Sequence, residues 1–249
     1  MRSLFLALGF AGLAAAANPC GPNDIQGTYG MQLSGVTTVG VDGPQPVAAI
    51  GRLVFDENGG VNGVSSIGIA GYFVGSPVNG KYSFKADCSL TFDLRDQSGG
   101  FQHFAGVAKD NATRVDIRQT DAQAGADGVL LRTASGCQTA SLHGAYAFNL
   151  AGTASEFADG RERGTPLSVK GTVTSDGAGN LELTWTGGHT TGTYEVDSDC
   201  IAEIELGVTQ GDSADIVKLR GVLVNQGRLL LAVESDPAGV AIARLIAKE

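Results

Sequence analysis

The sequence is poor in the residues on which most metal and acid–base chemistry depends. It has three histidines, four cysteines and one tryptophan in 249 residues, and no two histidines stand at the i, i+2 or i, i+4 spacing of metal ligands. It contains no Gly-x-Ser-x-Gly turn and no Gly-x-Gly-x-x-Gly ahead of a helix. Neither that class of hydrolase nor a nucleotide-binding protein is therefore predicted. We expect no metal and no other cofactor, and we favour a non-enzymatic function.

Basic residues are also scarce. The chain carries 17 lysines and arginines against 26 aspartates and glutamates, a formal net charge of −9. A protein that binds phosphates or anionic lipids concentrates positive charge on its surface. We therefore expect no nucleic-acid partner.

Long apolar runs are absent except at the N-terminus. Arg2 precedes an apolar run over residues 4–17, which ends in Ala15, Ala16 and Ala17. This pattern is typical of a secretory signal peptide, predicted here as residues 1–17. The run is shorter than the roughly 20 residues of a membrane-spanning helix, and no later run approaches it. The sequence thus predicts a secreted or periplasmic protein without a transmembrane segment.

The few cysteines contain no Cys-x-x-Cys pair. In an exported chain, four separated cysteines indicate two disulfide bonds more than a metal site. Three pairings are possible for four cysteines. The cysteines are Cys20, Cys88, Cys137 and Cys200.

An internal duplication selects among these pairings. Cys20 precedes Gly27-Thr28-Tyr29 by seven residues, and Cys137 precedes Gly144-Ala145-Tyr146 by the same interval. A second shared segment is Gly-x-Tyr followed by Asp-Cys, which ends at Cys88 in one half and at Cys200 in the other. Two domains are predicted, over residues 18–134 and 137–249. If each domain closes its own loop, the bonds are Cys20–Cys88 and Cys137–Cys200.

The hydrophobic pattern within each repeat has a period of two. Tyr146, Phe148 and Leu150 alternate with smaller or polar residues, as in a half-buried strand, and glycine, with 37 copies, separates the apolar runs like turns. Short connections favour an all-β fold of two tandem eight-stranded antiparallel up-and-down barrels, with β-sandwiches as the alternative. The strands predicted for the first repeat are 27–35, 46–55, 61–69, 79–86, 88–96, 101–108, 113–119 and 128–133, and those of the second lie within 144–246.

A glycine and an aromatic residue on the first strand, with an arginine on the last, resemble the signature of the calycins, the group of lipocalins and their allies. The allene oxide cyclase barrel and exported tandem-repeat proteins of unassigned role are similar in unit length. Tyrosine stands where lipocalins have tryptophan, and no cyclase active-site pattern is present. The resemblance implies that the arginine packs over the aromatic ring at the closed end of each barrel. The matching residues are Gly27, Tyr29 and Arg132, and Gly144, Tyr146 and Arg244.

An eight-stranded barrel is either filled by its own side chains or holds one small ligand. We therefore favour an exported protein that binds a small hydrophobic molecule inside one or both barrels. The alternative is a structural or adhesive surface module with solid cores. Candidate ligand-binding residues on inward positions are Tyr29, Met31, Phe55, Tyr82, Phe84, Phe92, Tyr146, Phe148, Trp185 and Tyr194.

Two less favoured interpretations rest on acidic residues. An isomerase of the cyclase type would need an ionisable group inside a barrel, and the carboxylates to inspect are Glu57, Asp87, Asp121, Asp199 and Asp236. The segments 56–60 and 176–180 combine Asp, Asn and Gly, which suit a calcium loop. The same residues suit a hairpin turn better, and the turn is our prediction.

Overall fold

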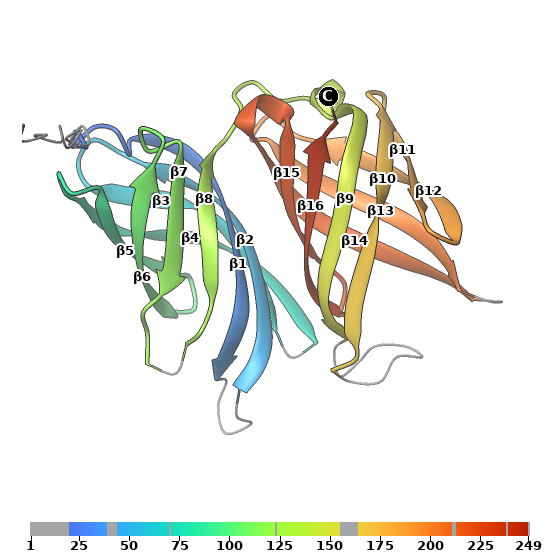
Figure 1. Cartoon of the computed structure of the whole chain (residues 1–249). Coiled ribbons are helices and arrows are strands. Elements are labelled where there is room, and N and C mark those ends of the chain that lie inside the picture. The colour runs from blue at the N-terminus through green and yellow to red at the C-terminus, as the bar shows by residue number, and fades with distance from the viewer. Residues whose placement is uncertain are drawn as a thin grey trace, which may run out of the picture.

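The fold is all-β, as the sequence predicts. The computed structural model describes residues 20–38, 44–69, 71–122, 124–154, 164–210, 213–237 and 239–248, so the predicted signal peptide lies outside the described residues. The strands form two closed antiparallel barrels in tandem, each of eight strands (Figure 1). The alternative of β-sandwiches is thereby excluded.

The first barrel is an up-and-down meander in which each strand pairs with the next. Its first and last strands also pair, with Tyr29 opposite Arg132, and this pairing closes the barrel. The strands are β1 (Gly27–Thr38), β2 (Pro44–Phe55), β3 (Gly60–Ile69), β4 (Tyr72–Phe84), β5 (Ser89–Asp96), β6 (Phe101–Lys109), β7 (Arg114–Gln119) and β8 (Asp127–Arg132).

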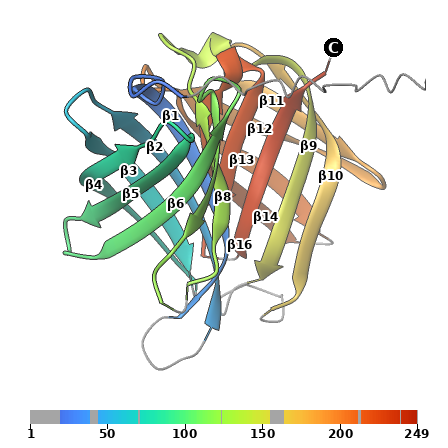
Figure 2. The same cartoon turned by 60° about the vertical axis from the view of Figure 1, so that its left-hand side comes forward.

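The second barrel repeats this topology and closes between its own first and last strands. Two short 3-10 helices accompany it, η1 (Thr139–Ser141) before the first strand and η2 (Asn225–Gly227) in a turn. The strands are β9 (His143–Ala154), β10 (Pro166–Asp176), β11 (Asn180–Trp185), β12 (Gly188–Val196), β13 (Ile201–Gln210), β14 (Ser213–Val224), β15 (Leu229–Glu234) and β16 (Gly239–Ala247). Figure 2 shows the two barrels side by side.

Glycine does more here than form turns. Several glycines lie on inward positions of the strands, where an added Cβ would collide with the neighbouring strand. At Gly63, Gly80 and Gly128 it would lie 2.0 Å from a backbone carbonyl oxygen, and at Gly192 2.2 Å. Small barrels need strongly bent strands, and glycine permits the close approach of backbones at the bends. Part of the high glycine content thus follows from close backbone contacts within the barrel walls.

Aromatic rings fill the closed end of the first barrel. Tyr29 and Phe55 meet edge to face with ring centroids 5.5 Å apart, and Phe92 stacks on Phe104 at 4.7 Å. The Tyr29 hydroxyl donates a hydrogen bond to the Ala112 carbonyl oxygen at 2.7 Å. These side chains are almost completely buried, so this end of the barrel is solid.

The arginine of the last strand takes its expected place in the first barrel. The Arg132 guanidinium lies 4.9 Å from the centroid of the Tyr29 ring, a cation–π distance. It also donates hydrogen bonds to the carbonyl oxygens of Asp24 and Gln26. The N-terminal segment is therefore tied over the closed end.

Arg244 of the second repeat occupies a different position. It pairs with Asn149 on the outer face, and Ala247 stands opposite Tyr146, where Arg132 stands opposite Tyr29 in the first barrel. The prediction that Arg244 packs over Tyr146 is therefore wrong, because Arg244 lies three residues before the matching position, on the other face of the strand. Tyr146 instead donates to the Gly227 carbonyl oxygen at 3.4 Å.

Burial of Tyr29 predicts a loss of stability in alkali. Desolvation raises the pKa of Tyr29 to about 12, although Arg132 lowers it. The pKa of a tyrosine in the unfolded chain is about 10. The raised pKa favours the folded state fully below about pH 10, and this contribution disappears as the pH rises toward about 12. Urea unfolding at increasing pH should show this decline, and Tyr29→Phe should make it shallower. An equal decline in the variant would contradict the assignment.

Both disulfides form as the duplication predicts. Cys20 is bonded to Cys88 and Cys137 to Cys200, with sequence separations of 68 and 63. Cys88 and Cys200 both have left-handed backbone conformations, with φ of 66° and 65°. The repeated unit therefore includes the turn geometry around each bond as well as the cysteines.

The outer walls of the two barrels pack against each other. A separate apolar cluster joins strands β2 and β8 to strands β14, β15 and β16. Gly30 on β1 has no room for a side chain, because a Cβ would lie 2.7 Å from Val224. The buried members of the cluster are Ala48, Ile50, Val129, Leu131, Val222, Val224, Leu231, Val233 and Val240.

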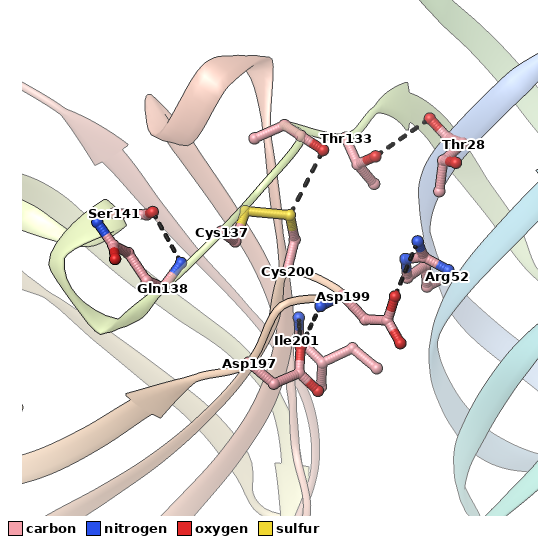
Figure 3. The surroundings of a disulfide bond; sticks show 11 residues. Thr28, Arg52, Thr133, Cys137, Gln138, Ser141, Asp197, Asp199, Cys200 and Ile201 are labelled. Carbon is pink, nitrogen blue, oxygen red and sulfur yellow. Dashed lines mark hydrogen bonds and ion pairs between the residues drawn. A yellow bond between two sulfur atoms is a disulfide. The ribbon is translucent and has the colours of Figure 1, made fainter.

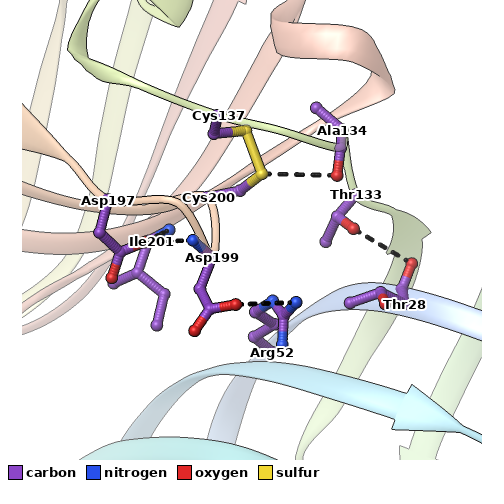
Figure 4. A network of polar contacts seen from close by, with 9 residues as sticks. All are labelled: Thr28, Arg52, Thr133, Ala134, Cys137, Asp197, Asp199, Cys200 and Ile201. Atoms are coloured by element: carbon purple, nitrogen blue, oxygen red, sulfur yellow. Dashed lines mark hydrogen bonds and ion pairs between the residues drawn. A yellow bond between two sulfur atoms is a disulfide. The ribbon is translucent and has the colours of Figure 1, made fainter.

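A polar contact lies at one edge of this interface, beside the second disulfide. An Arg52 guanidinium nitrogen lies 3.0 Å from an Asp199 carboxylate oxygen (Figure 3). The Sγ atom of Cys200 lies 3.4 Å from the Ala134 carbonyl oxygen in the linker between the barrels (Figure 4). Asp197 accepts hydrogen bonds from the backbone amides of Asp199 and Ile201, which holds the turn that presents Asp199 to Arg52.

Candidate functional site

A cavity of about 290 Å³ opens at the mouth of the first barrel, opposite its closed end. It lies among strands β3, β4, β5 and β6, which Figure 2 shows next to one another. The volume is near the lower end of the roughly 300–1,000 Å³ of small-molecule sites. The lining residues are Ser65, Ile67, Ile69, Val74, Ser76, Val78, Leu94, Asp96, Gly100, Phe101 and Gln102.

The walls of the cavity change from buried to exposed along its axis. Val78 and Leu94 are buried at its floor, and Ile67 is half-buried above them. Val74 lies at the rim and is 61% exposed, whereas the ring of Phe101 packs on the outer wall against His103 and Arg95. A hydrophobic path thus leads from solvent into the barrel.

Strand β4 builds one side of this rim and begins earlier than the sequence predicts. The prediction started at residue 79, whereas β4 starts at Tyr72. Pro77 and Gly75 lower strand propensity, but residues 72–77 pair with β3 alone, and pairing with β5 begins at Val78. Because the other edge of this segment is unpaired, proline is tolerated there. The β3–β4 hairpin therefore extends the barrel wall beyond β5.

Ser65 is the most buried polar residue of the cavity lining. It is 7% exposed, and its hydroxyl oxygen has no hydrogen-bond partner within the described part of the chain. A buried hydroxyl without a partner is unfavourable. Such groups call for an explanation, and Ser65 lies in the wall of a cavity.

Asp96 contributes a negative charge at the rim. Its carboxylate accepts hydrogen bonds from the Ser98 hydroxyl at 2.7 Å and the Gly100 amide at 2.8 Å. The Ser98 bond holds the pKa of Asp96 below its ordinary value, partly offset by desolvation. The lining residues include no lysine, arginine or histidine, although Arg95, which precedes Asp96, lies over the Phe101 ring at 6.0 Å from its centroid.

The ten predicted ligand-binding residues lie inside the barrels, but none of them lines this cavity. Most are buried, and Tyr82, Phe84 and Trp185 are half-buried. In both barrels these residues belong to the core or pack against it. Their role in ligand binding stays a prediction.

The two repeats differ most informatively at the position of Ser65. Ser65 on β3 stands opposite Gly51 on β2, and Trp185 on β11 stands opposite Gly171 on β10 in the matching place of the second barrel. Trp185 packs against the second core, and the hairpin β11–β12 turns directly after it. The second barrel therefore has a large ring and a short wall where the first has a hydroxyl and a long wall.

Larger hollows on the outer walls are less suited to a ligand. One of about 550 Å³ lies over β10, β11 and β12, and its side chains Thr174, Glu182 and Thr191 are exposed. Binding sites usually enclose apolar surface. We therefore take the mouth cavity of the first barrel as the candidate site.

The acidic residues considered for catalysis lie in turns outside the barrels' interiors. Glu57, Asp87 and Asp199 are exposed. Asp121 accepts hydrogen bonds from the His103 amide and ring, and Asp236 accepts one from the Lys218 amide. None of the five lines the mouth cavity.

The two Asp-Gly segments are hairpin turns, as predicted. Asp56 accepts hydrogen bonds from the amides of Asn58 and Gly60, and Asp176 accepts them from those of Ala178 and Asn180. Within the described residues, no group of three or more histidine, cysteine or acidic side chains could hold a metal ion.

The described residues contain no helix that is long and apolar enough to cross a membrane. No protein-family model matches the chain, and no curated protein matches its sequence.

Proposed function

We propose that the chain is an exported, lipocalin-like protein whose first barrel binds a small hydrophobic molecule at its mouth. The observation that carries the proposal is the cavity of about 290 Å³ with apolar walls and one buried hydroxyl. Two disulfides are compatible with an oxidising compartment outside the cytosol. The stack of Arg132 on Tyr29 supports the likeness to lipocalins.

The alternative function is that of a structural surface module, and the filled interior of the second barrel supports it. Its interior is packed from Tyr146 at one end to Leu206 toward the other, and Trp185 occupies the position that is open in the first barrel. If the first barrel binds the ligand, as we propose, the role of the second barrel is to stabilise the first, because the two share a buried apolar interface.

Filling the cavity should abolish binding. A neutral fluorescent dye such as N-phenyl-1-naphthylamine should bind the wild type saturably. Binding is measured as the fluorescence of the dye, excited in its own absorption band. Ser65→Trp places in the first barrel the ring that closes the second, and affinity should fall at least about tenfold because an occupied pocket excludes the ligand. Val64→Trp, one residue away on the outer face, is the matched control and should keep wild-type affinity.

Folding of each variant is checked by urea unfolding. Ser76→Trp blocks the same cavity from β4, at the position paired with Ser65. Saturable binding that survives both blocking variants would place the ligand elsewhere. A wild type that binds no neutral dye would leave the structural module as the better interpretation.

A further inference from the structure

The polar groups of the mouth cavity restrict the chemistry of its ligand. At the floor, the Ser65 hydroxyl can donate one hydrogen bond and accept others, and no described protein atom uses it. A ligand that reaches the floor therefore gains most if it carries a hydrogen-bond acceptor, such as a hydroxyl or carbonyl group.

The charges restrict the ligand further. Asp96 is the one charged residue of the lining, and the Ser98 and Gly100 bonds keep its carboxylate ionised and in place. A ligand carboxylate would meet this charge without any basic partner in the lining, and the whole chain has a formal net charge of −9. Like charges in a partly buried site repel.

The rim indicates where the apolar part of the ligand lies. Val74 is a large exposed apolar side chain at the mouth, and Ile67 and Ile69 continue this surface inward along β3. A chain or ring that leaves the floor and passes between these residues would cover them from water.

We infer that the cavity selects neutral amphiphiles, which are slim apolar molecules with one hydroxyl or carbonyl group, and that Ser65 Oγ hydrogen-bonds this group at the floor. Free fatty acids of the same length are disfavoured by Asp96. This inference rests on the proposed function, and it adds the ligand class and the orientation of the ligand.

The test is displacement of the neutral dye by matched competitors. At about pH 8, where a carboxylic acid is ionised, 1-octanol should displace the dye from the wild type at a concentration at least about tenfold lower than octanoate. Ser65→Ala should weaken 1-octanol about threefold to tenfold, the usual effect of one hydrogen bond, and leave octane unchanged. Asp96→Asn, which preserves the turn cap, should strengthen octanoate about threefold.

The outcomes separate the inference from the function on which it rests. Absence of saturable dye binding overturns the proposed function. Dye binding with octanoate as effective as 1-octanol overturns the ligand class but leaves the site in place. Equal loss of octane and 1-octanol in Ser65→Ala overturns the hydrogen bond, because a purely structural defect affects both competitors alike.

Discussion

Removal of the second disulfide by Cys137→Ala with Cys200→Ala is expected to lower the free energy of unfolding by about 4 kcal/mol. The bond spans a sequence separation of 63, and a loop of this length restricts the unfolded chain by roughly that amount. Both cysteines are also buried against the second core. Urea unfolding followed by the fluorescence of Trp185, the single tryptophan, measures the loss in the barrel that contains the bond.

The matched control is Ser135→Ala with Ser198→Ala, which changes neighbouring positions and keeps the bond. Its unfolding free energy should stay within about 0.5 kcal/mol of the wild type. Wild-type protein refolded with a reductant loses both disulfides and should be destabilised at least as much as the cysteine variant. An oxidised cysteine variant that unfolds at the wild-type urea concentration would show that the bond contributes little.

The architecture could be predicted because two independent signals in the sequence agree. The alternation of apolar residues places Tyr146, Phe148 and Leu150 on one face, and the structure buries all three. The duplication pairs the cysteines without any knowledge of the fold. Agreement between a local pattern and a long-range repeat leaves few topologies.

The position of Arg244 could not be predicted in this way. The last strand of the second repeat has an alanine, Ala247, where the first has Arg132, and the nearby arginine lies three residues earlier. An odd shift in a strand moves a side chain to the other face. Because of this shift, Arg244 lies in the interface between the barrels, whereas Arg132 lies at the closed end of the first barrel.

The alternation of inward aromatic residues does not predict the position of the cavity. Large rings on inward positions fill a small barrel, as Phe55 and Phe92 do, whereas a cavity requires small side chains. The signal in the sequence was the contrast of Ser65 with Trp185 at one position of the repeat. Comparing residue volumes between the two halves would have found it.

The interface between the barrels also had a signal in the sequence. Residues 229–233 are apolar without alternation, which indicates a strand that is covered on both faces. The structure covers the outer side of Leu231 and Val233 with the first barrel, whereas Leu230 and Ala232 face the second core.

Gln32 is expected to have the largest effect of any single residue in this interface. It lies on the outer side of β1 and is 1% exposed. Its side-chain amide donates to the carbonyl oxygens of Ala232 at 2.8 Å and Ala243 at 3.0 Å. Its carbonyl oxygen accepts a hydrogen bond from Arg244 at 2.8 Å. Gln32→Leu should reduce the free energy of unfolding by about 3 kcal/mol, because it leaves buried polar groups without their partner.

The location of the tryptophan makes this a test of coupling between the barrels. Gln32 belongs to the first barrel and Trp185 to the second, so a shift of the Trp185 unfolding midpoint in Gln32→Leu reports energy that passes through the interface. Gln26→Leu makes the same chemical change in the first barrel, where the amide contacts only exposed Asn23 among the described partners, and it should leave that midpoint unchanged. If Gln32→Leu destabilises the protein but the Trp185 midpoint stays in place, the barrels unfold independently. The second barrel would then not support the ligand site of the first.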